Sequence, residues 1–336
     1  MELARLQHCK FSRSAGNLVS THFSRSRSFR VALITALLFA PRLAHAQLQL
    51  GHKVLGGLGI NAGVQSEPGF FLMERFISYD SGTLKDRDGN DVPVPGLDVD
   101  ARGNMLGMGL TIKPKGLPYL SIAAGFPIAH VTVNSDLPFG STDRSGLGDA
   151  YVQPIKVGFR EKHFDAVASY SFYAPTGDFE PRRVSVGRGF WTHQFSVGGA
   201  VYPKKDRRYR ASLLGSYDLN GWKRDIDIKR GNTMQLQGGA GLALAKFAMI
   251  GVAGFGLWQV ADDRGDDIPP VLRGLRTRVY GIGPELSLTW KQRLFVELRY
   301  EFEMGARSRL EGNVLAAGLS YKLWNGQNGQ PAAADR

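Results

Sequence analysis

Cysteine is almost absent from this sequence of 336 residues, since the only one is Cys9. It precedes a short apolar run, whereas the lipid-bearing cysteine of a lipoprotein would follow such a run. Once the leader that contains it is removed, the mature chain has no thiol. Disulfides, thiolate metal ligands and a cysteine nucleophile are therefore excluded from the mature protein.

Long hydrophobic runs are also missing. After residue 46 no stretch reaches the 18 apolar residues that a membrane-spanning helix needs, and no helical periodicity of useful length appears. A membrane protein without such helices has to be a closed β-barrel, because only closure pairs every backbone donor and acceptor in hydrocarbon. The other reading of an all-β chain is a soluble sandwich.

A basic run interleaved with aromatic residues is absent as well. The formal net charge is +12, but residues 1–46 hold seven Lys/Arg and one acidic residue. The remaining chain holds 35 Lys/Arg and 29 Asp/Glu, a net charge of +6 that is spread over turns and loops. We therefore expect no nucleic-acid partner.

The N-terminus has the pattern of a secretory signal peptide. Arg25, Arg27 and Arg30 precede the apolar residues 31–40, and an Ala-His-Ala cleavage signal ends at Ala46. We expect residues 1–46 to be cleaved after export. The Gly-rich residues 47–68 then form an irregular N-terminal segment, either in the periplasm or entering a barrel lumen.

Residues 280–303 predict a β-hairpin with one apolar and one polar face. Even-numbered residues such as Ile282 and Leu298 are apolar, whereas odd-numbered residues such as Glu285 and Arg299 are polar, on either side of the connector 291–293. Each arm has the length of a tilted membrane-spanning strand, roughly 9–11 residues. Alternation alone does not say whether the apolar face meets lipid or a core.

About twelve strands are expected between residues 69 and 324. They are 69–80, 103–113, 118–131, 147–160, 164–174, 191–202, 209–219, 232–245, 247–260, 277–290, 294–303 and 312–324. Strands 69–80 and 247–260 are apolar on both faces, so their register stays open. Gln153 and Pro154 interrupt another strand, which indicates a bulge or a shift of phase.

The connectors between these strands alternate in length. Long connectors are 81–102, 132–146, 175–190, 220–231, 261–276 and the shorter 305–311; the intervening ones are 114–117, 161–163, 203–208, Lys246 and 291–293. Bacterial outer-membrane barrels have long extracellular loops, short periplasmic turns and an even strand number. The sequence thus predicts an all-β protein, a closed antiparallel transmembrane β-barrel of about 12 strands in the bacterial outer membrane. The polar residues 325–336 are expected to be a disordered tail.

The polar face of this barrel supplies the candidate site. Charged residues of several strands should line the lumen: Glu285, Glu297, Arg299, Glu301, Glu303, Arg210, Asp218, Asp165 and Lys156. They form either a charged constriction that selects solutes or a salt-bridged filling that closes a narrow lumen, and the sequence leaves both open.

Neither a metal site nor a catalytic set is expected. Residues 86–97 resemble a calcium loop in part, but Asp91 stands at the sixth place, where glycine is needed, and Leu97 at the twelfth, where glutamate is needed. His193 and Ser196 are three residues apart, which puts them on opposite faces of a strand. We expect no enzyme activity, no metal and no cofactor.

Three short motifs resemble a known family. They are residues 145–149 (SGLGD), residues 173–179 (YAPTGDF), and residues 61–65 (NAGVQ) with Pro68 and Gly69. With the Gly-rich final strand they resemble the outer-membrane transporter family named after the meta-pathway of phenol degradation. The resemblance implies a barrel for passive uptake of small hydrophobic or aromatic molecules. The alternative is a structural or surface-interaction barrel with a filled lumen. Expected partners are the solute, outer-membrane lipid with lipopolysaccharide, and the barrel-assembly machinery, which would recognise the aromatic closing strand.

Overall fold

Residues 51–136, 141–181 and 183–324 are described by the structure, which is a computed structural model. The expected signal peptide (residues 1–46) and tail (residues 325–336) lie outside these residues. Two short 3-10 turns, η1 (Gly59–Asn61) and η2 (Pro270–Leu272), occur in the described part of the chain. No helix found there is long and apolar enough to cross a membrane.

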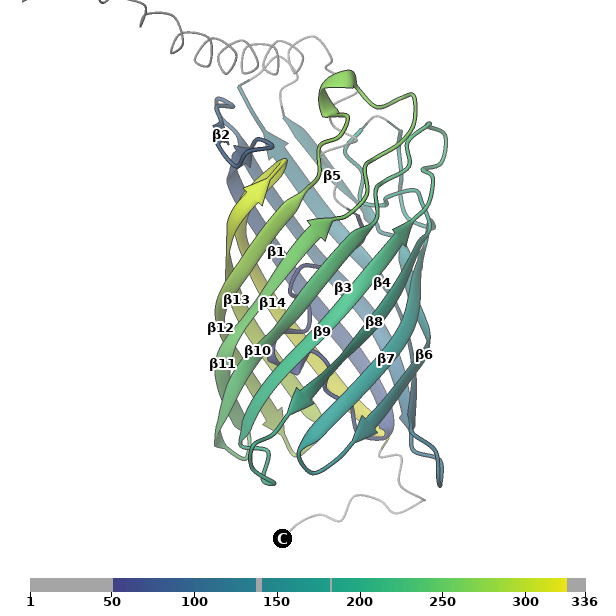
Figure 1. The fold of residues 1–336 in the computed structure, drawn as a ribbon, viewed down its shortest axis with the longest axis vertical. Coiled ribbons are helices and arrows are strands. Elements are labelled where there is room, and N and C mark those ends of the chain that lie inside the picture. Colours follow the sequence, from purple (N-terminus) through teal and green to yellow (C-terminus); the bar gives the residue numbers. More distant parts are fainter. Residues whose placement is uncertain (1–50, 137–140, 182, 325–336) are drawn as a thin grey trace, which may run out of the picture. The chain divides into compact units, whose positions relative to one another are not determined.

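Twelve antiparallel strands close into a barrel (Figure 1), which confirms the predicted fold class. They are β1 (Gly69–Lys85), β3 (Asp98–Ile112), β4 (Tyr119–Asn134), β6 (Ala150–Arg160), β7 (Phe164–Ala174), β8 (Thr192–Val201), β9 (Tyr209–Asn220), β10 (Thr233–Ala245), β11 (Ala248–Gln259), β12 (Arg278–Trp290), β13 (Leu294–Arg307) and β14 (Arg309–Trp324). Closure is made by β1 and β14, which pair over most of their length. Because short periplasmic turns are the rule, the end with the short connectors is the periplasmic one.

Two short strands add to the extracellular end. The two-residue β2 (Asp91–Val92) pairs with the end of β1, and β5 (Thr142–Leu147) pairs with β4 beyond the point where β6 leaves it. The strand expected over 147–160 is β6, which begins three residues later, at Ala150. β5 lies almost entirely within the connector that was expected over 132–146. The interruption at Gln153 and Pro154 is a register shift between β6 and β7.

The last extracellular connector differs from the expectation. A loop was predicted over 305–311, but β13 continues to Arg307 and β14 begins at Arg309, which leaves Ser308 as the only linking residue. Ser308 has a φ of +52°, in the left-handed region that a tight reversal requires. The pairing of β1 with Glu311, Leu310 and Arg309 supports this long hairpin from the other side.

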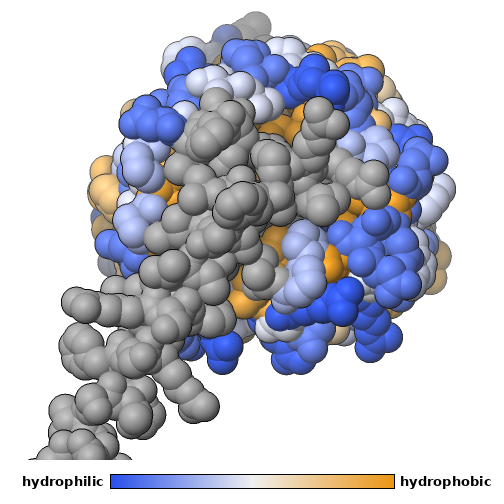
Figure 2. Space-filling view, turned by 90° about the horizontal axis from the view of Figure 1, so that it is seen from above, coloured by the Kyte–Doolittle hydropathy of each residue, from blue (hydrophilic) through white to orange (hydrophobic). Residues whose placement is uncertain are grey.

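Alternation puts the apolar residues on the outer face of the wall. Large hydrophobic side chains exposed there occur on almost every strand: Leu106, Ile128, Phe159, Val197, Leu213, Val252, Ile282, Leu298 and Leu319. Seen from the extracellular end, hydrophilic residues predominate around the rim (Figure 2). An exposed apolar surface of this extent is unfavourable in water and favourable against acyl chains.

If the outer face lies in hydrocarbon, the cost of placing an arginine on it depends on depth in the membrane, which can be tested on one strand. Val197 lies in the middle of β8 and is 68% exposed, whereas Val201 lies at its periplasmic end and is 54% exposed. Val197→Arg should lower the free energy of unfolding in lipid vesicles by about 2–4 kcal/mol, and Val201→Arg by about 0–1 kcal/mol. Equal costs at the two positions would mean that this face is not immersed in hydrocarbon.

Candidate functional site: the occupied lumen

The barrel lumen is occupied by residues 51–68, which we call the lumen segment (Figure 1). The segment descends from the extracellular end, where His52 contacts the start of β8, to the periplasmic end, where β1 begins at Gly69. Ile60, Ala62 and Gln65 are almost completely buried there. The lumen is thus filled by main chain as well as by wall side chains.

His52 fixes the extracellular end of the segment. Its Nε2 lies 2.6 Å from the Asp149 carboxylate and its Nδ1 lies 2.8 Å from the Thr192 hydroxyl. The imidazole stacks on the ring of Tyr173, with centroids 4.7 Å apart, and meets the ring of Phe190 edge-on at 4.8 Å. Polar and aromatic groups of the wall and its loops therefore hold this ring from all sides.

Asp149 connects the segment to an extracellular loop. Besides His52 it accepts hydrogen bonds from the backbone N–H groups of Gly177 and Arg188. Burial raises the pKa of Asp149, but the hydrogen bonds from His52 and the two backbone groups outweigh it and hold the pKa below its usual range. An ionised carboxylate thus lies where the segment, the 175–191 loop and the break between β5 and β6 meet.

Lys53 makes the next attachment. Its Nζ lies 2.9 Å from Asp218 of β9 and donates a hydrogen bond to the Ser216 hydroxyl. Both charged side chains are buried, and Asp218 also accepts hydrogen bonds from Gln194 and Thr233. Removing one partner of such a pair leaves an uncompensated buried charge, which is expensive.

The middle of the segment exposes its backbone polar groups to wall side chains. The N–H of Leu58 donates to Gln237, and the N–H of Ile60 donates to Glu285 at 3.0 Å. The Ser212 hydroxyl donates to the carbonyl oxygen of Ile60. These contacts satisfy backbone groups that the turns within the segment, such as η1, leave unpaired.

The periplasmic part is held in the same way. Lys156 donates to the carbonyl oxygen of Val64, and the N–H of Gln65 donates to Asp165. Glu67 lies between Lys322 of the closing strand and Arg160. Burial raises the pKa of Glu67, but the two cations have the larger effect and bring it below its usual range.

The structure places all nine residues of the predicted lumen set on the inner face. Six of them hydrogen-bond to the segment or form an ion pair with it: Glu285, Glu297, Arg210, Asp218, Asp165 and Lys156. Arg299 lies between Glu285 and Glu301, at 3.3 and 3.2 Å, and Glu303 pairs with Arg309. Most of the predicted lumen residues therefore hold residues 51–68 in place.

The lumen segment approaches the backbone of the wall closely at Gly63, and only glycine permits this. The φ of Gly63 is +72°, and a Cβ added there would lie 2.5 Å from the backbone nitrogen of Gly199 in β8. Two glycines from distant parts of the sequence thus form one contact between main chains. No side chain fits at this point without moving the segment.

Several contact residues escaped the sequence reasoning, among them His52, Lys53, Asp149 and Arg75. Arg75, which pairs with Glu297 and donates to the carbonyl oxygen of Gly57, lies in a strand whose register the pattern left open. His52 and Lys53 lie in a segment without periodicity. The available signal was the polarity of residues 52 and 53 inside an otherwise Gly-rich and apolar stretch.

Residues 86–97 form no calcium loop, and His193 and Ser196 form no catalytic pair. Asp86 accepts hydrogen bonds from the backbone of Asp88 and Asn90, as in an Asx turn. In the part of the chain that the structure describes, no three His, Cys, Asp or Glu residues are grouped to hold a metal. His193 is bonded to Tyr170 on the outer face, away from Ser196.

A family model described as "Putative MetA-pathway of phenol degradation" matches residues 82–319, which is more than half of the chain. The chain belongs to this family. The resemblance in the sequence motifs is thereby confirmed. A search of the curated proteins found no match.

Solved structures agree on the fold. An outer-membrane channel from Pseudomonas putida F1 superimposes with a TM-score of 0.68 at 11% identity, covering 78% of this chain and 97% of that chain. The transport unit of the autotransporter AIDA-I from Escherichia coli reaches 0.49 at 12% identity, covering 86% and 97%. The CymD monoaromatic hydrocarbon channel reaches 0.40 at 8% identity, covering 78% and 91%. The channel from Pseudomonas putida F1 thus shares the fold of this chain. With the apolar outer face, the fold establishes an outer-membrane β-barrel.

The Gly63 contact predicts a specific way to displace the segment. Gly63→Ala should speed amide hydrogen exchange in residues 58–66 because the new methyl meets the backbone of Gly199. Gly116→Ala is the matched control, since its φ of +75° imposes similar strain, about 1–2 kcal/mol, while nothing lies within 4 Å of its Cβ. If residues 58–66 exchange equally fast in the Gly63→Ala and Gly116→Ala variants, Gly63 does not pack closely on Gly199.

The Lys53–Asp218 pair predicts a measurable coupling. Lys53→Met or Asp218→Asn alone should weaken the attachment of the segment by about 3 kcal/mol, because a buried charge loses its partner. The double variant should cost less than the sum of the two. The difference in a double-mutant cycle, read from hydrogen exchange of residues 52–58, should be about 1–3 kcal/mol. Strict additivity would show that the pair does not act as one.

Proposed function

We propose that this protein is an outer-membrane channel for passive uptake of small hydrophobic or aromatic molecules, and that the lumen segment controls its opening. The observation that carries the proposal is the way in which the lumen is filled. Residues 51–68 are held chiefly by hydrogen bonds and ion pairs to side chains on at least six strands, β6, β7, β9, β10, β12 and β13. Water can replace such contacts one by one, so displacement of the segment opens the barrel without unfolding its wall.

The nature of the cargo follows from the extracellular half of the lumen. Phe255, Leu257 and Val279 form a buried apolar cluster on its inner wall, and Leu55 of the segment packs on it. The rings of Tyr151 and Tyr173 lie 5.1 Å apart beside His52. Surfaces now covered by Leu55 and His52 suit a small apolar or aromatic molecule that enters from outside. The family's description, which refers to phenol degradation, supports the same class.

Passive transport of this kind requires neither catalysis nor a cofactor. The wall offers a path of low barrier, and the charged residues beneath the apolar mouth, such as Glu285 and Arg299, disfavour bulky apolar molecules. We further propose that outer-leaflet lipid surrounds the apolar belt and that the barrel-assembly machinery recognises β14, which ends with Tyr321 and Trp324.

A second candidate is a structural or surface-interaction barrel that stays permanently filled. It is favoured by the burial of Ile60 and Ala62, both 0% exposed, which is as complete as in a soluble core. The two candidates differ in whether removing the segment creates a pore.

Deleting the lumen segment distinguishes them. A mature chain without residues 51–66 should give discrete currents in planar bilayers at least several-fold larger than the complete mature chain, because the wall remains closed by β1 and β14. Lys53→Met should increase the frequency of opening without changing the fully open current. Absence of current from both the complete and the shortened barrel would favour the structural role.

The cargo is tested by measuring uptake in cells. A strain lacking the gene should take up monoaromatic compounds more slowly than the strain complemented with the complete protein. A hydrophilic solute of similar size is the control. If both solutes are affected equally, the channel exists but lacks the proposed preference.

A further inference from the structure

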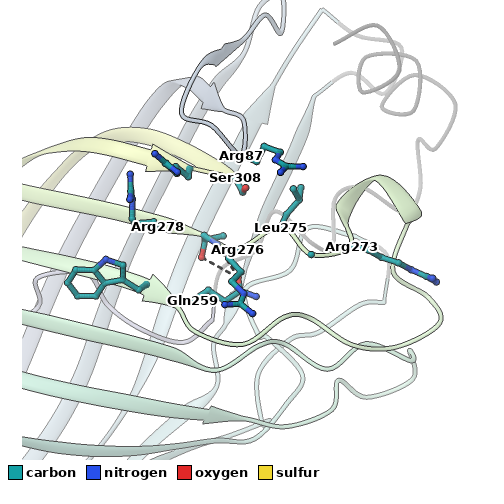
Figure 3. A pocket seen from close by; sticks show the side chains of 11 residues that line it. Arg87, Gln259, Arg273, Leu275, Arg276, Arg278 and Ser308 are labelled. Carbon is teal, nitrogen blue, oxygen red and sulfur yellow. Dashed lines mark hydrogen bonds between the residues drawn. The ribbon is translucent and has the colours of Figure 1, made fainter. Parts of the chain in front are cut away.

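Five arginines are among the residues that line a hollow of about 510 Å³ at the extracellular rim. They come from three separate parts of the chain: Arg87 from the turn before β2; Arg273, Arg276 and Arg278 from the loop before β12 and the start of that strand; and Arg307 from the end of β13. We call this group the rim arginines. The side chain of Arg273 points away from the other labelled arginines (Figure 3) and donates a hydrogen bond to the carbonyl oxygen of Ile268. Only the closure of the barrel brings Arg87 near Arg307, which is 220 residues later.

Most of the positive charge in this group is not neutralised by the protein. Arg276 is paired with Asp262 at 2.7 Å, and Arg87 lies 3.9 Å from Asp88. Within the described ranges, no carboxylate lies within 4.0 Å of the charged nitrogens of Arg273, Arg278 or Arg307. The site therefore has a surplus of positive charge facing outward.

Arg278 and Arg307 are direct partners across β12 and β13. Two like charges at opposed positions of neighbouring strands repel each other and destabilise the pairing. The Arg278 guanidinium lies 5.5 Å from the centroid of the Tyr280 ring, and its Nε is buried without a hydrogen-bond partner among the described residues. A bound anion would remove the repulsion and supply the missing acceptor.

The position in the wall identifies the kind of anion. Below Arg278 the outer face continues with Tyr280 and the exposed Ile282, and below Arg307 with the exposed Met304 and Phe302. Trp258 lies beside Arg278 on β11 and lines the same hollow. Charges immediately above an aromatic and apolar belt stand at the level of lipid headgroups.

We propose that the rim arginines, with Arg278 and Arg307 at the centre, bind phosphate groups of lipopolysaccharide in the outer leaflet. Planar guanidinium groups bind phosphate oxygens with paired, charge-assisted hydrogen bonds. The bound lipid bridges β12, β13 and the β1–β2 turn, and so stabilises the extracellular end of the wall next to its closure. The inference rests on the outer-membrane location and is independent of transport.

Lipid binding by the purified, detergent-solubilised protein tests this site. Lipopolysaccharide should bind the wild type, and Arg278→Gln with Arg307→Gln should weaken binding by roughly tenfold for each arginine, because one charge-assisted hydrogen bond contributes about that factor. The matched control is Arg102→Gln with Arg183→Gln, which removes the same charge from exposed arginines that are paired with Asp100 and Glu180. This control should bind like the wild type.

Two further arms identify the ligand. Lipopolysaccharide stripped of its phosphates should bind as weakly as the double variant does, and inorganic phosphate should compete only at millimolar concentration. Tight binding of inorganic phosphate alone would show a site for a free anion and overturn the lipid assignment. An equal loss in the Arg102/Arg183 control would show unspecific attraction by net charge and would also overturn it. Planar-bilayer currents of the Arg278/Arg307 variant should be unchanged. A negative result in the lipid-binding test therefore does not contradict the proposed channel function.

Discussion

Backbone hydrogen bonding in hydrocarbon is the constraint on which this structure depends. A chain without apolar helices can cross the membrane only if each strand has a neighbour on both sides, and the pairing of β1 with β14 provides the last one. Closure fixes which face of every strand meets lipid. It also creates an interior that residues 51–68 fill, so that buried polar side chains such as Glu285 and Arg299 need partners. The charges of the inner wall and the segment that they bind are consequences of the same closure.

The lumen segment extends this logic to the interior. An irregular peptide cannot enter a barrel unless its N–H and C=O groups find acceptors and donors, and the inner wall supplies Glu285, Gln237, Asp165 and Ser212 for that purpose. The segment in turn neutralises part of the wall, since Lys53 pairs with Asp218. Wall and segment are therefore complementary in charge, and they also share apolar contacts, such as Leu55 on the Phe255 cluster and Ala62 with Val167 and Leu214. An attachment made of many modest polar contacts suits a segment that has to move.

Two of the motifs that indicated the family meet at the extracellular end of the lumen segment, and the third contacts the wall nearer its periplasmic end. The Asp149 carboxylate at the end of the 145–149 motif accepts the N–H of Gly177 in the 173–179 motif and binds His52. Gly63 of the 61–65 motif packs on the backbone of β8. Short Gly-rich motifs thus mark places where main chains approach each other closely, which explains why their chemistry was difficult to interpret from the sequence.

Alternation with a period of two, together with the alternating lengths of the connectors, predicted the fold from the sequence alone. It gave the strands, their number, the outward apolar face and the inward position of residues such as Glu285 and Arg299, because each strand reports its own orientation locally. Residues 47–68 have no such period, and nothing local indicates that Ile60 lies against Glu285, 225 positions later. The partners of the segment, the meeting of Arg278 with Arg307 and the extension of β13 to Arg307 depend on strand register and closure. Those are properties of the whole barrel, so only the tertiary structure could decide them.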